Sequence, residues 1–233
     1  MIGKLYGVGL GPGDPELMTL KAYRLIQNAD VIAYPTLEGG ESFARAIAAA
    51  ALPDGVEEIA IHVPMSVKRE PAQAAYDTGA AQIAVALDVG KSVVVLCEGD
   101  PFFYGSFMYL FSRLSDRYET EVVAGVTSVT ACAAAMQKPL TARNEVLTII
   151  PGPISADDLH ARVRGAEAVA IMKVGRHLPK IKKVLADLNL TQHAVYVERA
   201  TLPVEKVLPL ADAPEPAPYF SMILVTKGND PWL

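Results

Sequence analysis

The chain has 233 residues, 51% of them hydrophobic, so it can bury the core of one large domain or of two smaller ones. Its net charge is −5, and it carries no long basic run, which argues against a nucleic-acid partner. Two cysteines are too few for a disulfide framework, and no apolar stretch approaches the ~18 residues of a membrane span. These features predict a cytoplasmic protein with no membrane partner.

Short apolar runs alternate with helical patterns along the first half of the chain. Strands are predicted over residues 4–9, 31–35, 57–63 and 92–97, and helices over 19–30, 42–52, 71–88 and 104–114. Thr19 and Ser42 are placed to act as N-caps. This β-α-β-α order predicts a mainly parallel sheet with helices on both faces.

The polar stretch over residues 114–120 is the candidate domain boundary, and it divides the chain into an N-terminal α/β domain, 1–117, and a C-terminal α/β domain, 118–233. The second part is predicted to hold strands at 121–125, 145–152, 166–175 and 193–199 and helices at 127–137, from Ser155 onward and at 178–190. Two final strands, 204–210 and 219–228, are joined by a short loop rather than a helix. The second sheet is therefore expected to be mixed, with antiparallel strands at its C-terminal end.

The glycine-rich stretch GVGLGPGDP at residues 7–15 resembles a dinucleotide-binding turn but fails its spacing. The G-x-G-x-x-G pattern counted from Gly7 meets Pro12, and counted from Gly9 it meets Asp14. Proline removes a backbone donor, and an aspartate places negative charge where a phosphate would lie. A nicotinamide-dependent oxidoreductase is therefore a disfavoured alternative.

Acidic residues also follow the fourth predicted strand, where Glu98, Gly99 and Asp100 precede a proline. Ligands of open α/β sheets bind at the carboxyl ends of the strands. Acidic loops at that edge favour a ligand with hydroxyl, amino or cationic groups. A glycine turn can also be plain scaffolding, and an acidic residue can simply cap the next helix, so both alternatives stay open.

Four motifs together resemble, in order and spacing, those of the tetrapyrrole (corrin/porphyrin) methyltransferases. They are GVGLGPGDPELMTLKA (7–22), EGDPFFYGSF (98–107), AGVTSVTACAA (124–134) and VERAT (197–201). The resemblance covers essentially the whole chain. It implies two α/β domains with the active site in a trough between them and S-adenosylmethionine (SAM) as methyl donor.

Further stretches are similar to one branch of this family, which methylates C20 of precorrin-2 in cobalamin biosynthesis. They are YPTLEGGESFARAIA (34–48), PLTARNEVLTIIPG (139–152), AIMKVGRHLPKI (170–181) and YVERATLP (196–203). The chain departs from one pattern of the family at the position after Tyr34. Relatives that methylate uroporphyrinogen have an aspartate there, which is linked to proton transfer. This chain has Pro35, so that role does not carry over.

The resemblance also assigns residues to the cofactor, with Pro12 closing the glycine loop beneath the tetrapyrrole side of the trough. The cofactor-binding residues implied are Pro12, Glu98, Gly99, Asp100, Phe103, Tyr104, Thr127, Ser128, Met172, Ala200 and Met222. Thr127 and Ser128 would hold the methionine carboxylate at a helix start, and the last three would enclose the adenine. Asp100 and Tyr104 are the candidates for a catalytic base.

A tetrapyrrole with many carboxylates requires local positive charge on this acidic chain. The candidate substrate-binding residues are Lys68, Arg69, Arg143, Lys173 and Arg176. No His/Cys cluster has metal-ligand spacing, so no protein-bound metal is expected. The resemblance implies a homodimer, and two alternatives stay open: methylation of another ring position, and a non-catalytic tetrapyrrole- or nucleoside-binding protein.

Overall fold

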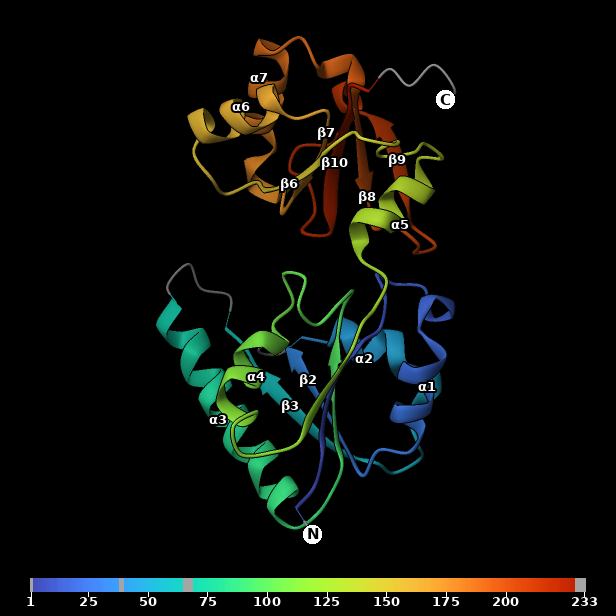
Figure 1. Cartoon of the computed structure of the whole chain (residues 1–233), viewed down its shortest axis with the longest axis vertical. Helices are drawn as coiled ribbons and strands as arrows, with labels where there is room; N and C mark the ends of the chain where they lie inside the picture. The colour runs from blue at the N-terminus through green and yellow to red at the C-terminus, as the bar shows by residue number, and fades with distance from the viewer. Residues whose placement is uncertain (1, 38–39, 65–68, 229–233) are drawn as a thin grey trace. The chain divides into compact units, whose positions relative to one another are not determined.

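The computed structural model describes residues 2–37, 40–64 and 69–228, which form two compact units, Met1–Thr127 and Ser128–Leu233 (Figure 1). Each unit is built on its own five-stranded sheet. None of the helices in the described part of the chain is long and apolar enough to cross a membrane.

The first unit contains a parallel sheet with the strand order β3-β2-β4-β1-β5. Its strands are β1 (Leu5–Gly9), β2 (Val31–Thr36), β3 (Glu57–His62), β4 (Val93–Cys97) and β5 (Thr120–Val123). Its helices are α1 (Leu20–Gln27), α2 (Phe43–Ala48), α3 (Arg69–Asp88) and α4 (Phe107–Leu114), with the short 3-10 helices η1 (Pro15–Leu17) and η2 (Ala49–Ala51). The prediction of a parallel first sheet is confirmed.

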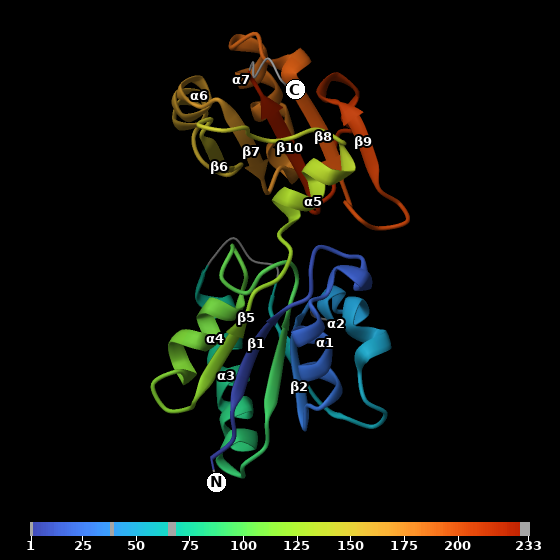
Figure 2. The ribbon, with the colours of Figure 1, turned by 45° about the vertical axis from the view of Figure 1, so that its right-hand side comes forward.

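Helices cover both faces of this sheet (Figures 1 and 2). Val94 and Leu96 of β4 point into the layer under α1 and α2, whereas Val93 and Val95 point into the layer under α3 and α4. This alternation along a fully buried strand explains the continuous apolar run in the sequence. Burying one such valine or leucine side chain contributes about 1.5–3 kcal/mol.

Strand β5 decides where the first unit ends. It pairs in parallel with β1, so that Val8 lies opposite Val123. The first unit therefore extends to Thr127, past the predicted boundary at residues 117–118. The polar stretch before β5 is a turn between α4 and the edge strand of the same sheet, not a link between domains.

The second unit contains a mixed sheet with the strand order β6-β7-β10-β8-β9, as predicted. Its strands are β6 (Leu147–Pro151), β7 (Ala168–Met172), β8 (Ala194–Glu198), β9 (Lys206–Pro209) and β10 (Ser221–Thr226). Its helices are α5 (Ser128–Ala135), α6 (Ala156–Gly165) and α7 (Leu178–Asp187), with the 3-10 helices η3 (Gly175–His177), η4 (Thr191–His193) and η5 (Leu210–Asp212). Only β6 and β7 pair in parallel, and the other neighbours run antiparallel.

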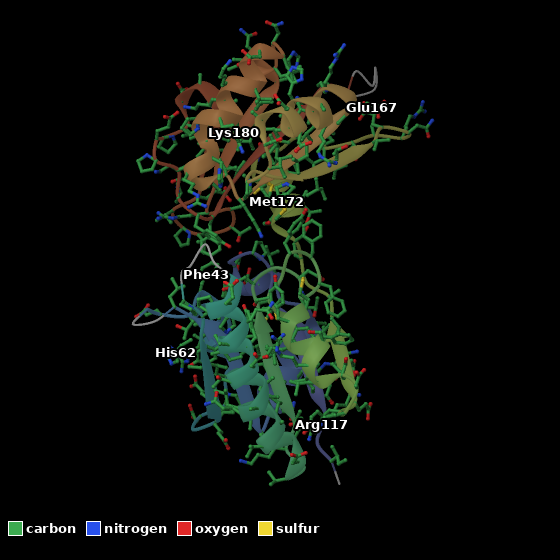
Figure 3. All side chains as sticks on the ribbon, turned by 90° about the vertical axis from the view of Figure 1, so that its left-hand side faces the viewer. Phe43, His62, Arg117, Glu167, Met172 and Lys180 are labelled. Atoms are coloured by element: carbon green, nitrogen blue, oxygen red, sulfur yellow. The ribbon has the colours of Figure 1, made fainter. Side chains whose placement is uncertain are left out.

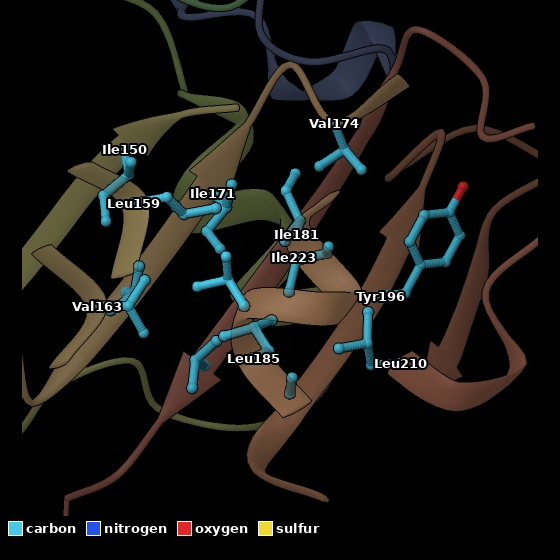
Figure 4. Packing of buried hydrophobic residues seen from close by; sticks show 14 of the residues in the cluster. Ile150, Leu159, Val163, Ile171, Val174, Ile181, Leu185, Tyr196, Leu210 and Ile223 are labelled. Carbon is cyan, nitrogen blue, oxygen red and sulfur yellow. The ribbon is translucent and has the colours of Figure 1, made fainter. Parts of the chain in front are cut away.

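One face of the second sheet packs against α6 and α7 in a cluster of buried hydrophobic side chains (Figure 4). Ile171 and Ile223 pair across β7 and β10 and meet Ile181 and Leu185 of α7 in this cluster. Helix α5 packs against β10, and none of its buried side chains belongs to the cluster. The two faces of the second sheet are therefore covered by different helices.

The helix starts follow the sequence signals. The side chains of Thr19, Ser42 and Ser155 accept hydrogen bonds from the backbone N–H groups three residues on, which confirms them as N-caps. Ser155 also donates to the Asp158 carboxylate at 2.6 Å. These contacts set the first turns of α1, α2 and α6 locally.

Candidate active site

The carboxyl ends of β1 and β4 form the switch point of the first sheet. From β1 the chain crosses over β4 to reach β2, whereas from β4 it crosses over β1 to reach β5. The two loops therefore leave toward opposite faces, α1 lying on one and α4 on the other. Open α/β sheets bind their ligands at such a point.

Three glycines bring the strand ends together at this switch point. Gly11 and Gly99 form an isolated antiparallel bridge, with N···O distances of 3.2 and 2.8 Å. A Cβ on Gly125 would lie 2.1 Å from the Gly99 carbonyl oxygen, and one on Gly9 would lie 2.6 Å from the Gly125 nitrogen. We call the packing of Gly9, Gly99 and Gly125 the glycine contact. These glycines thus allow three backbones to touch.

The glycine-rich loop after β1 does not lead directly into an α-helix. Asp14 instead caps the short η1, accepting a hydrogen bond from the Glu16 N–H at 2.9 Å, and α1 begins only at Leu20. A phosphate-binding turn needs free N–H groups at the start of the following helix. The loop after β1 therefore lacks the direct strand-to-helix turn of a phosphate-binding motif.

Asp100 joins two of the loops at the switch point. Its Oδ1 accepts a hydrogen bond from the Phe102 N–H at 2.9 Å, and its Oδ2 accepts one from the Gly125 N–H at 3.0 Å. Both carboxylate oxygens are therefore engaged in holding backbone. The contact gives Asp100 a clear positioning role in the loop that precedes α4.

The loop from Asp100 to Gly105 folds tightly and presents aromatic side chains. A Cβ on Gly105 would lie 2.6 Å from the carbonyl oxygens of Asp100 and Pro101, so glycine is needed there. Tyr104 has a φ of 56°, is 44% exposed, and packs edge-on against Phe103 at 5.3 Å between ring centres. The predicted pair Phe103 and Tyr104 is therefore brought together beside the switch point.

Glu98 directly follows the buried strand β4 and lies half-buried at the same edge. Burial raises the pKa of its carboxyl group, while the N–H groups of Glu98 itself and of Ala44 act in the opposite direction. The net effect is a raised pKa. Glu98 is thus a carboxyl that keeps its proton to higher pH than an exposed glutamate does.

Predicted residues also meet at one edge of the second sheet. Met172 ends β7, Met222 is the second residue of β10, and the pairing of Ile171 with Ile223 carries the two methionines to facing positions. Met222 also pairs with Val197 of β8, two residues before the bend that leads to Ala200. Figure 3 labels Met172 at the end of its strand. Met222 and Ala200 are buried, and Met172 is partly exposed.

The remaining cofactor candidates occupy loop and helix starts. Ser128 is the first residue of α5, and Thr127 directly precedes it as the last residue of the first unit. Pro12 lies between the bridged Gly11 and the capping Asp14. The predicted helix start at Thr127 and Ser128 is therefore present.

The predicted substrate-binding cations lie on different segments of the chain. Lys173 and Arg176 are exposed just beyond β7, Lys173 with a φ of 56°, and Arg143 is exposed in the loop before β6 with a φ of 49°. Lys68 lies outside the described residues; Arg69 begins α3, and its side chain is likewise not described. Among these candidates, Lys173 and Arg176 share the segment that directly follows β7.

Two neighbours of Arg176 have perturbed titration. Burial, followed by the charges of Lys180 and Arg176, lowers the pKa of His177. Burial also lowers the pKa of Lys180, whose Nζ donates to the carbonyl oxygens of Gly152 and Ile154. Lys180, labelled in Figure 3, thus ties α7 to the loop after β6 and does not belong to a purely solvated face.

Sequence reasoning missed one polar cluster at this edge. Glu198 is 2% exposed and contacts Tyr196 and Lys206, all on β8 and β9. The alternation of β8 carried the signal, because Glu198 shares the parity of the inward-facing Ala194 and Tyr196.

The two sheets, the first parallel with a switch point and the second mixed, define a two-unit α/β protein. Residues 4–214 match the family described as Tetrapyrrole (Corrin/Porphyrin) Methylases. The chain belongs to this family.

Known relatives agree along almost the full length. The chain is 40% identical to the precorrin-2 C(20)-methyltransferase of Sinorhizobium sp, covering 98% of this chain and 97% of that protein. It is 32% identical to the cobalt-precorrin-2 C(20)-methyltransferase of Salmonella typhimurium strain LT2, covering 97% and 98%. Among solved structures, uroporphyrin-III C-methyltransferase of Thermus thermophilus in complex with S-adenosyl homocysteine has a TM-score of 0.69 and 25% identity, over 97% of this chain and 92% of that chain.

Proposed function

We propose that the protein is a SAM-dependent methyltransferase that methylates C20 of precorrin-2, or of its cobalt form, to give precorrin-3A in cobalamin biosynthesis. The observation that carries this proposal is the 40% identity to a precorrin-2 C(20)-methyltransferase over 98% of the chain. Relatives of both the metal-free and the cobalt type align along the chain, so the metal content of the substrate is a question for the assay.

The residues at the two sheet edges fit this cofactor chemically. The first edge offers the half-buried Glu98 and the engaged Asp100, with Asp14 in the glycine loop, a set that suits hydroxyl and cationic groups and disfavours phosphate. The second edge offers the apolar side chains of Met172 and Met222, which suit a flat adenine ring. SAM has hydroxyl, ammonium and sulfonium groups and an adenine.

When bound, SAM supplies an activated methyl group, and the chain's contribution is mainly alignment. Holding the acceptor carbon in line with that methyl group can provide about 7–11 kcal/mol of barrier lowering. Gly99 suits such an approach, because a Cβ there would meet only the Val126 carbonyl oxygen at 3.9 Å. We propose that Glu98, Gly99, Phe103 and Pro12 line this side of the cofactor site.

The other cofactor residues have complementary roles in the proposal. Thr127 and Ser128 would bind the methionine carboxylate at the start of α5, where a helix favours an anion. Met172, Ala200 and Met222 would enclose the adenine. These assignments extend the motif resemblance to residues that the structure places at strand and helix ends.

A proton leaves C20 after methyl transfer, and we propose Asp100 and Tyr104 as the candidate groups that accept it. Both lie in the loop between β4 and α4, where Tyr104 is 44% exposed and both oxygens of Asp100 accept backbone hydrogen bonds. Lys173 and Arg176, exposed beyond β7, would bind carboxylates of the tetrapyrrole, with Arg143, Lys68 and Arg69 as further candidates.

We also propose that the protein is a homodimer and acts in the cytoplasm.

The test is a turnover assay with SAM carrying an isotopically labelled methyl group, offered with metal-free precorrin-2 in one vessel and the cobalt-loaded ring in the other. Product NMR locates the new methyl group. Transfer to C20 in either vessel supports the proposal and identifies the accepted form. Binding of S-adenosyl homocysteine without transfer in either vessel would redirect the assignment to another ring position or to a binding role.

A further inference from the structure

A buried carboxylate with an exposed cationic partner ends β8 in the second unit. Glu198 is 2% exposed, and each of its carboxylate oxygens has a partner. The Tyr196 hydroxyl donates to Oε2 at 2.7 Å, and the Lys206 Nζ contacts Oε1 at 2.9 Å. Glu198 and Lys206 also face each other in the β8–β9 register, so strand pairing fixes the ion pair.

Burying the Glu198 carboxylate costs free energy. A buried carboxylate loses its hydration, and an apolar side chain of similar volume would pack there without that loss. Burial acts to raise the pKa of Glu198, but the hydrogen bonds from Lys206 and Tyr196 outweigh it and hold the pKa below its ordinary value. The group is therefore charged at neutral pH, and its charge is matched by Lys206.

The backbone that follows Glu198 is strained. Arg199 and Thr201 have φ values of 50° and 71°, in the left-handed region that side chains other than glycine disfavour. The turn is held by the Arg199 N–H, which donates to the Phe220 carbonyl at 2.9 Å, and by the Thr201 N–H, which donates to the Glu205 carboxylate at 2.6 Å. Strained backbone of this kind persists only where its surroundings hold it, and it gathers at functional sites.

The cluster and the turn together fix the strand ends that carry the proposed adenine contacts. Ala200 lies within the strained turn, and Ser221, directly before Met222, pairs with Glu198 in the β8–β10 register. Ser221 in turn donates to the Pro218 carbonyl at 2.7 Å. Glu198 is thus linked through the backbone to the two segments that carry Ala200 and Met222.

We infer that the Glu198–Lys206 ion pair is a positioning device that holds the Arg199–Thr201 turn in the conformation that binds the adenosyl part of the cofactor. This inference rests on the proposed function. Glu198 is a positioning residue in this scheme, because it acts through the turn and not by touching the cofactor.

The test measures the Kd of S-adenosyl homocysteine by calorimetry for the wild type and for Lys206→Met, Lys206→Arg and Glu198→Gln. Lys206→Met is the main variant, because the Lys206 side chain is 56% exposed and its removal leaves little empty space. We expect Lys206→Met and Glu198→Gln to raise this Kd by about tenfold, as loss of one charge-assisted hydrogen bond predicts. Lys206→Arg keeps the charge and should restore binding to within about twofold of the wild type.

Lys183→Met is the matched control, since it removes an exposed ion pair with Asp187 on α7 in the same unit. Its Kd should match the wild type. In turnover, Lys206→Met should raise the KM for SAM and leave kcat and the KM for the tetrapyrrole unchanged, and a calorimetric melt reports whether each variant is folded.

A folded Lys206→Met protein with wild-type Kd and a lower Tm would overturn the inference alone, because the ion pair would then serve stability only. Equal loss of binding in Lys206→Arg and Lys206→Met would also overturn it. A wild-type protein that binds no S-adenosyl homocysteine would instead overturn the proposed function, and the inference with it.

Discussion

Replacing Gly125 by alanine tests whether the glycine contact holds the switch point of the first sheet together. The added Cβ would lie 2.1 Å from the Gly99 carbonyl oxygen and 2.8 Å from the Gly9 Cα. All of these neighbours are backbone, so no flexible side chain can move aside. The strand ends of β1, β4 and β5 must separate to admit the methyl group.

The expected cost is at the upper end of overpacking substitutions, about 2–3 kcal/mol. For a unit of this size, Met1–Thr127, that lowers the Tm of the first unit by about 7–11 °C. Separation of the loops should also move Asp100, whose Oδ2 accepts the Gly125 N–H, and so weaken ligand binding at that edge.

The assay is differential scanning calorimetry together with the Kd of S-adenosyl homocysteine. Gly165→Ala is the matched control, because a Cβ there meets nothing within 4 Å and the residue ends α6. It should leave both values unchanged or raise the Tm slightly. A Gly125→Ala protein with the Tm and Kd of the wild type would refute the reasoning that the three backbones are in contact.

Three further changes probe individual groups. Asp100→Asn leaves one acceptor oxygen, so the side chain can accept from the N–H of Phe102 or of Gly125 but not from both. The free energy of unfolding, measured by chemical denaturation, should fall by about 1–3 kcal/mol. An unchanged denaturation midpoint would contradict the bridging role of Asp100. The pKa of Glu98 is higher in the folded protein, so stability should fall as pH rises above its ordinary pKa of 4.5. Glu98→Gln should remove that fall, which is measured by denaturation midpoints from about pH 4 to about pH 8. Identical pH profiles of the variant and the wild type would contradict the prediction. Ser155→Ala should cost about 1 kcal/mol by uncapping α6, and a second-unit Tm equal to that of the wild type would show that the cap contributes nothing.

Much of the local structure was predictable because its causes are local. The caps Thr19, Ser42 and Ser155 lie three residues before the N–H groups from which they accept hydrogen bonds, and short apolar runs identify the strands before their partners are known. The failed glycine spacing likewise depends only on Pro12 and Asp14, so the sequence alone excluded a dinucleotide turn. Motif order pointed to the family that residues 4–214 match.

Tertiary structure alone decided which distant segments meet. Gly9, Gly99 and Gly125 touch only because β4 and β5 flank β1, and this strand order also placed residues 120–123 in the first unit. The partner of Glu198 was equally hidden, because Lys206 reaches it through antiparallel pairing of β8 with β9. A residue and its sequence neighbours determine its local hydrogen bonds and caps. Strand order and register, which are set by burial over the whole sheet, determine which distant residues it contacts.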